Sequence, residues 1–128
     1  MSFEEGLFYY LDNYAGLSAE VDDRIYPAVL PPTPEYPAVT YNRISTPRLA
    51  QFENLFLPHA RFQFDCWAEE FSRAKDVAEQ VRLALDLYSG PMGAYTAHIC
   101  IIDDEIDTYE PETEIWHSII DVIIWYLE

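Results

Sequence analysis

The stretch from Ala60 to Tyr88 changes its hydrophobic period, and this change constrains the fold more than any other feature. In its first part, apolar and mostly polar residues alternate, which predicts a strand with one buried face; the apolar set is Ala60, Phe62, Phe64, Cys66 and Ala68. In its second part, apolar residues recur every three or four positions, which predicts an amphipathic helix; these are Ala74, Val77, Ala78, Val81, Ala84, Leu85 and Tyr88. Ser72 is the predicted N-cap, and the Ser89-Gly90-Pro91 sequence is the predicted stop. A strand that leads directly into such a helix must fold the helix back over a sheet.

The remaining segments supply further strands and an N-terminal helix. Residues 3–14 show helical spacing with Glu4 and Glu5 in the first turn, and Gly16 is predicted to end this helix; its apolar side carries Leu7, Tyr10, Leu11 and Tyr14. We expect extended segments at 21–26, 38–45, 94–102 and 115–127. In the segment 94–102, one face is predicted to carry Tyr95, Ala97, Ile99 and Ile101. The fold is therefore predicted to be α+β: a mostly antiparallel sheet of about four to five strands, packed against an N-terminal and a central helix, in a single domain over residues 1–128.

Residues 27–37, PAVLPPTPEYP, are proline at five of eleven positions. Proline lacks the backbone donor and fixes φ, so this segment is predicted to be an extended loop at the edge of the sheet. Pro31, Pro32 and Tyr36 are candidates for contact with a neighbouring subunit. Further on, Thr46-Pro47 is predicted to end a strand, and Arg48 to Pro58 to connect it to the next one.

The last predicted strand, 115–127, is apolar on both faces. Its even face includes Ile120, Val122, Ile124 and Tyr126, and its odd face includes Ile115, Ile119, Ile123 and Trp125. The central helix can cover only one of them, and we expect it on the even face because Asp121 on the odd face would be costly to bury. We expect the odd face to be closed partly by the N-terminal helix and partly by a neighbouring subunit. Ile119, Ile123 and Trp125 are therefore candidate subunit-interface residues.

The chain carries 23 acidic and 7 basic residues, for a net charge of −16, and Lys75 is its only lysine. This balance argues against binding to nucleic acid or to anionic membranes. The start, MSFEEGLFYY, is acidic where a signal peptide would be basic, and no apolar run reaches the roughly 20 residues of a membrane span. We therefore expect a soluble protein made in the cytoplasm.

Catalytic and metal-binding signatures do not emerge from the sequence. Cys66 and Cys100 are predicted to be buried thiols. His98 and His117 could meet across neighbouring strands, but no third ligand is spaced to join them. The segment 103–114 matches some positions of a calcium-loop template, namely Asp103, Glu105, Asp107 and Glu114. Thr108 and Glu110 stand where the template has glycine and an aliphatic residue, so we interpret 103–114 as a solvated hairpin loop. No enzymatic activity and no cofactor are expected.

Three segments, in order, resemble a known protein family. RIYPAVLPPTPEYPAVTYNRIS (24–45) resembles the R-I-Y-P…P…P-x-V-x-Y…I-S signature of the small tail-completion, tail-to-head joining or tail-terminator proteins of long-tailed bacteriophages. RFQFDCWAEEFSRAKDVAEQVRLAL (61–85) is similar to that family's strand and following helix, with Phe71 in place of the usual tyrosine. IWHSIIDVIIWYLE (115–128) is similar to its final strand. The acidic segment has no counterpart that we can place.

The resemblance implies a structural role in a phage or prophage virion. The expected assembly is a hexameric ring at the head-proximal end of the tail, in contact with the tail tube protein and a head-completion protein, and built in the cytoplasm of the host bacterium. An acidic ring would let DNA slide through without sticking. Two alternatives remain open: an acidic protein-binding module or DNA mimic, and a small hydrolase that uses Asp103, Asp104 and a histidine.

Overall fold

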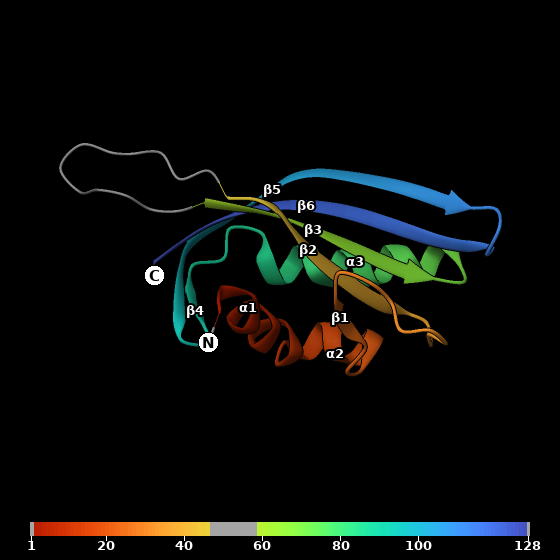
Figure 1. Cartoon of the computed structure of the whole chain (residues 1–128), viewed down its shortest axis with the longest axis horizontal. Helices are drawn as coiled ribbons and strands as arrows, with labels where there is room; N and C mark the ends of the chain where they lie inside the picture. Colours follow the sequence, from red (N-terminus) through yellow and green to blue (C-terminus); the bar gives the residue numbers. More distant parts are fainter. Residues whose placement is uncertain (1, 47–58, 128) are drawn as a thin grey trace.

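The computed structural model describes residues 2–46 and 59–127, which form three helices and a curved sheet (Figure 1). The helices are α1 (Phe3–Asp12), α2 (Ala15–Val21) and α3 (Phe71–Leu85). The strands are β1 (Ile25–Pro27), β2 (Ala38–Ser45), β3 (His59–Ala68), β4 (Gly90–Met92), β5 (Tyr95–Glu110) and β6 (Ile115–Leu127). Their order in the sheet is β1-β2-β3-β6-β5-β4; β1 and β2 are parallel, and the other neighbours are antiparallel.

The α+β class was predicted, but the described residues form a sheet of six strands instead of four or five, and it is mixed. The additional edge strand β4 is only three residues long, as is β1, and such strands are too short to show a period. The pair β1–β2 is parallel because the proline-rich residues 28–37 carry the chain back before it re-enters the sheet. The predicted connection from Arg48 to Pro58 lies outside the described residues.

The helix α3 covers the even face of β6, as predicted. Ile120, Val122 and Ile124 are buried between α3 and the sheet, next to the buried rings of Phe62 and Phe64 on β3. The alternation predicted for β3 is also confirmed, since its apolar residues are buried and their neighbours are half-exposed. Cys66 and Cys100 are buried free thiols, and burial raises the pKa of Cys100 to about 12.

The N-terminal helix lies on the same side of the sheet as α3 (Figure 1). Phe3 of α1 stacks on Tyr126 with ring centroids 3.9 Å apart, and it contacts Phe62 at 5.8 Å. The expectation that this helix would close the odd face is therefore wrong. An apolar stripe shows that a helix has a buried side, but it does not show which face of the sheet that side will meet.

The predicted start of the N-terminal helix at Phe3 is confirmed, but its predicted end is wrong. Helix α1 begins after Ser2, whose Oγ accepts a hydrogen bond from the Glu5 N–H at 3.2 Å, and it ends at Asp12. Gly16 does not end it but lies inside α2, where a Cβ on residue 16 would come within 2.1 Å of Gln80 Oε1 on α3. A side chain at this position would require the end of the Gln80 side chain to move.

Both boundaries of α3 lie earlier in the chain than predicted. The helix begins at Phe71 with Glu70 as its N-cap, so Ser72 lies in its first turn and does not cap it. It ends at Leu85, before the predicted stop at Ser89 to Pro91, because the chain then pairs with β5. The Leu87 N–H donates to the Cys100 carbonyl at 2.9 Å, and the Cys100 N–H donates to the Tyr88 carbonyl at 3.0 Å.

The acidic segment is mostly strand. Residues 103–110 continue β5 and pair with β6, so only residues 111–114 form the hairpin turn. The loop prediction failed because pairing with the long apolar β6 outweighs the low strand propensity of Asp and Glu. Register shifts at Ala97/Ile99 and Ile102/Asp104 also overturn the predicted single face of β5: Ala97 and Cys100 face the helices, whereas Ile99 and Ile101 face away from them.

Candidate subunit interface

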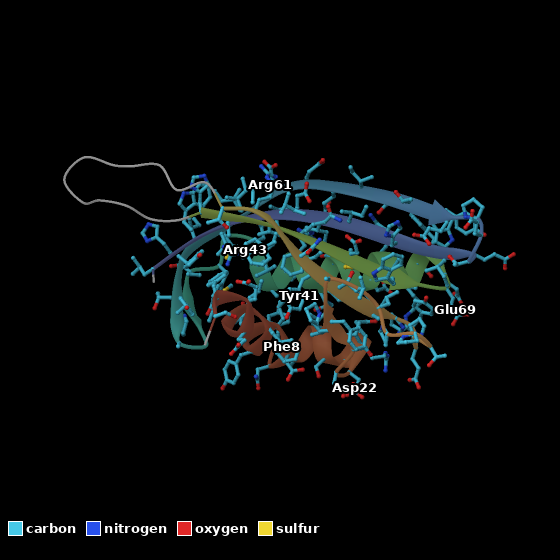
Figure 2. All side chains as sticks on the ribbon, viewed as in Figure 1. Phe8, Asp22, Tyr41, Arg43, Arg61 and Glu69 are labelled. Atoms are coloured by element: carbon cyan, nitrogen blue, oxygen red, sulfur yellow. The ribbon has the colours of Figure 1, made fainter. Side chains whose placement is uncertain are left out.

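The sheet has one face that no described helix covers, and we name it the open face. Figure 1 shows the three helices below the sheet, and Figure 2 shows Arg61 on its upper side and Tyr41 on the helix side. The cross-strand register places the odd residues of β6 on the open face, opposite the odd residues of β3. The residues of β5 that pair with these odd residues of β6 also lie on the open face.

Apolar side chains form a strip along β5 and β6 on the open face, and the pair Asp104–Asp121 interrupts it. We name it the isoleucine strip; it consists of Ile99, Ile101, Ile106, Ile119, Ile123 and Trp125. In the register, Ile99 lies opposite Trp125, Ile101 opposite Ile123 and Ile106 opposite Ile119. Ile101 is 38% and Ile106 52% exposed, and the four others are half-buried. The structure thus brings the three predicted residues of β6 together with three isoleucines of β5. Sequence reasoning missed Ile106 because it assigned the acidic segment to a loop.

Charged groups interrupt this strip near the middle of β6, where Asp104 lies opposite Asp121. Arg61 Nη1 lies 2.6 Å from Asp103 Oδ2 and 3.9 Å from Asp121 Oδ2. Burial raises the pKa of Asp121, Arg61 opposes this rise, and Asp104 and Asp103 add to it. The Oδ1 atom of Asp121 is buried and has no hydrogen-bond partner among the described residues. A single arginine is therefore shared between several carboxylates, and the charge of Asp121 is poorly compensated.

The end of the open face beside the hairpin turn is polar and more tightly packed. The buried His117 lies with Nδ1 3.8 Å from Asp65 Oδ2 and Nε2 3.9 Å from Glu110 Oε1. The Trp67 ring stacks on His117 at 4.3 Å, and its Nε1–H donates to Thr40 Oγ1 at 3.0 Å. Burial raises the pKa of Asp65. The apolar part of the open face therefore ends at this cluster, and the isoleucine strip extends away from it.

The histidines and acids considered for metal binding or catalysis do not converge. His98 lies at the bulge between Ala97 and Ile99, whereas His117 pairs with Thr108, far along the hairpin. Residues 103 and 110 stand on one extended strand, about 23 Å apart at ~3.3 Å per residue. Within residues 2–46 and 59–127, no group of three or more His, Cys, Asp or Glu side chains is arranged to hold a metal ion. No helix in the described part of the chain is long and apolar enough to cross a membrane.

The proline loop, residues 28–37, forms a second surface. Pro32 is exposed, while Pro31 and Tyr36 are half-buried. Arg24 Nε donates to the Pro37 carbonyl at 2.8 Å and so anchors the end of the loop. The loop stands beside β2, near the junction of β3 and α3, where Tyr36 lines a cavity of about 220 Å³. The structure does not bring the loop together with the isoleucine strip, since β3 and β6 separate β2 from β5 in the sheet.

Comparison with known proteins agrees with the resemblance found in the sequence. The family described as "Tail completion protein gp17" matches residues 5–127. A chain in the solved structure "Virion of native gene transfer agent (GTA) particle" has the same fold, with a TM-score of 0.78 and 17% sequence identity over 94% of this chain and 90% of that chain. No curated protein matches the sequence. Because the family match spans nearly the whole chain, this protein belongs to the tail completion protein gp17 family, and it is a structural tail protein of a phage-type virion.

Proposed function

We propose that this protein completes the head-proximal end of the tail as a hexameric ring, and that the isoleucine strip contributes to the contact between neighbouring copies. The observation that carries the proposal is the strip itself: six apolar side chains on a sheet face that the described helices leave uncovered. An exposed cluster of apolar side chains next to charged groups is typical of a protein–protein interface. Membership in a tail completion family supports an assembly role for this surface.

The charges of the chain also favour an apolar contact between copies. Each of the six basic residues in the described parts of the chain lies in an ion pair within the chain: Arg24–Glu35, Arg43–Glu4, Arg61–Asp103, Arg73–Glu20, Lys75–Asp107 and Arg82–Glu79. Two copies with a net charge of −16 each repel one another, and these cations are already engaged. The attraction must then come mainly from apolar burial, because exposed ion pairs contribute little.

The same charge suits a ring that surrounds DNA during packaging or ejection. A strongly acidic lining has no affinity for phosphate, so the genome does not adhere to it. We propose that one side of the ring contacts the tail tube protein and the other a head-completion protein. The alternative of an acidic binding module or DNA mimic predicts a chain that remains monomeric.

Size-exclusion chromatography with light scattering, at several protein concentrations and two salt concentrations, tests the proposal. We expect a mass that rises toward six copies as protein concentration increases, and closed rings in negative-stain electron micrographs. Raising the salt concentration should favour the ring, because screening weakens the repulsion between acidic copies. A protein that stays monomeric at all concentrations, both alone and with purified tail tubes, would contradict the ring and favour the binding-module alternative.

A further inference from the structure

Tyrosine rings form a second apolar surface, at the opposite side of the molecule from the open face. We name it the tyrosine groove; its volume is about 270 Å³, and it is lined by Tyr9, Tyr10, Asn13, Tyr14, Tyr88, Pro91 and Gly93. It lies between the second half of α1 and the segment that leads from α3 into β4. None of its lining residues is charged, although the chain as a whole is strongly acidic.

The rings of the groove are held in place by their own contacts. The Tyr10 hydroxyl donates to the Ala84 carbonyl at 2.6 Å, and the Tyr88 hydroxyl donates to the Pro91 carbonyl at 2.7 Å. The Tyr10 and Tyr88 rings pack with centroids 4.3 Å apart, and Tyr14 lies 6.4 Å from Tyr10. Because the Tyr10 and Tyr88 side chains are fixed before any ligand arrives, they lose little conformational entropy when something binds to them.

A fixed groove lined by tyrosines suits a proline-rich segment. Proline rings dock on aromatic grooves because they are flat and apolar and because proline restricts the backbone. The chain itself contains a proline-rich segment, Pro31-Pro32-Thr33-Pro34, within the proline loop, and its backbone bends at Pro32 and Thr33. These four residues belong to no strand or helix, and Pro32 and Thr33 are exposed. The described contacts of the loop leave the outer surface of these two residues free for a partner.

We propose that the proline loop of one copy binds in the tyrosine groove of the next copy. The groove lies beside α1 and β4, whereas the loop extends from β1 toward the opposite end of the molecule (Figure 1), so the two surfaces of one chain do not meet. Such a head-to-tail contact repeats from copy to copy and closes into a ring when the rotation fits. The inference rests on the proposed ring, because it identifies a pair of surfaces through which neighbours join.

Charge supports this choice of occupant. Residues 28–37 contain a single charged residue, Glu35, whose Oε2 lies 4.0 Å from Arg24 Nη1. The groove contributes no charge. Two copies of a chain with a net charge of −16 repel each other over most of their surfaces. The loop and the groove form a pair of surfaces that can approach with little electrostatic cost.

Disulfide crosslinking of the full chain tests the inference. The double variant Tyr9→Cys/Thr33→Cys places one cysteine at the groove and one in the loop, and each single variant is a control. Tyr9 is 57% exposed at the rim of the groove. The native Cys66 and Cys100 are buried and serve as an unreactive background. Under mild oxidation, we expect the double variant to give a ladder of covalent multimers up to six copies. The single variants should give dimers at most, and circular dichroism should show that all three are folded.

A second measurement separates failure of the inference from failure of the ring. A synthetic peptide, AVLPPTPEYP, is titrated into the wild-type monomer and followed by the tyrosine ring resonances, beside a control peptide with alanine at residues 31, 32 and 34. If the wild type forms rings but the double variant gives no more multimers than the single variants, the inference is overturned and the proposed ring stands. If no ring forms, the titration decides: shifts of the Tyr9 and Tyr14 resonances with the native peptide alone support the groove, and their absence refutes it.

Discussion

Adjacent residues of β6 should respond in opposite ways to the same substitution. Val122 is fully buried on the helix side between Phe62 and Ile102, whereas Ile123 is half-buried on the open face beside Arg61. Val122→Asp loses the burial of a valine, worth about 1.5–3 kcal/mol. It also buries an unpaired charge, at a cost of about 3–5 kcal/mol. Together these are comparable with the whole stability of a domain of this size, about 5–15 kcal/mol. We expect this variant to be unfolded or strongly destabilised.

Ile123→Asp should leave the monomer folded, because water reaches the new carboxylate and Arg61 lies directly opposite. Its cost should be at most about 1 kcal/mol. In a ring that covers the isoleucine strip, the same carboxylate would be buried, and Arg61 is already shared between Asp103 and Asp121. A cost of about 3–5 kcal/mol per interface weakens each contact roughly a hundredfold to a few thousandfold.

Circular dichroism melts and light scattering separate the two outcomes. The matched control is Thr113→Asp, which adds the same charge in the exposed hairpin turn, away from the strip. It should remain folded and should still assemble. If Ile123→Asp unfolds the monomer, the open face is internal and the assignment of the interface is wrong. If Ile123→Asp assembles like wild type, the isoleucine strip does not lie between the subunits.

Three further predictions follow from the charges. Burial raises the pKa of Asp121, and covering the open face would raise it further. Assembly should therefore take up protons, and the ring should become more stable as the pH falls toward the ordinary Asp range. Asp121→Asn should weaken this pH dependence, and a ring that becomes more stable as the pH rises would refute the reasoning. The chain should not shift duplex DNA in a gel at about 150 mM salt, because it carries one lysine and a net charge of −16; a clear shift would contradict this reasoning. The melting temperature should be the same with excess calcium and with a chelator. The Asp107 carboxylate already accepts hydrogen bonds from Lys75 and Ser118, and it stands on an extended strand. An increase of many degrees with calcium would show that calcium binds the native state.

The sequence alone determined the elements with a long, regular pattern. The alternation in β3 and the helical spacing in α3 were each clear, because many consecutive residues repeat the same period. The position of α3 on the even face of β6 could also be predicted, since the single charged residue Asp121 marks the odd face. The proline-rich segment, the net charge and the resemblance to phage tail proteins were likewise available before the fold was known.

Only the tertiary structure decided how these elements combine. The acidic residues 103–110 form a strand because β6 offers them a partner, and two bulges reassign the faces of β5, so neither Ile106 nor Ile99 could be placed from local pattern. The side of the sheet occupied by α1 depends on contacts such as Phe3 with Tyr126, which connect the two ends of the chain. Local propensity acts over a few residues, whereas strand pairing and helix docking depend on partners far away in the sequence. The apolar strip on the open face and the tyrosine groove therefore became visible only in the folded chain.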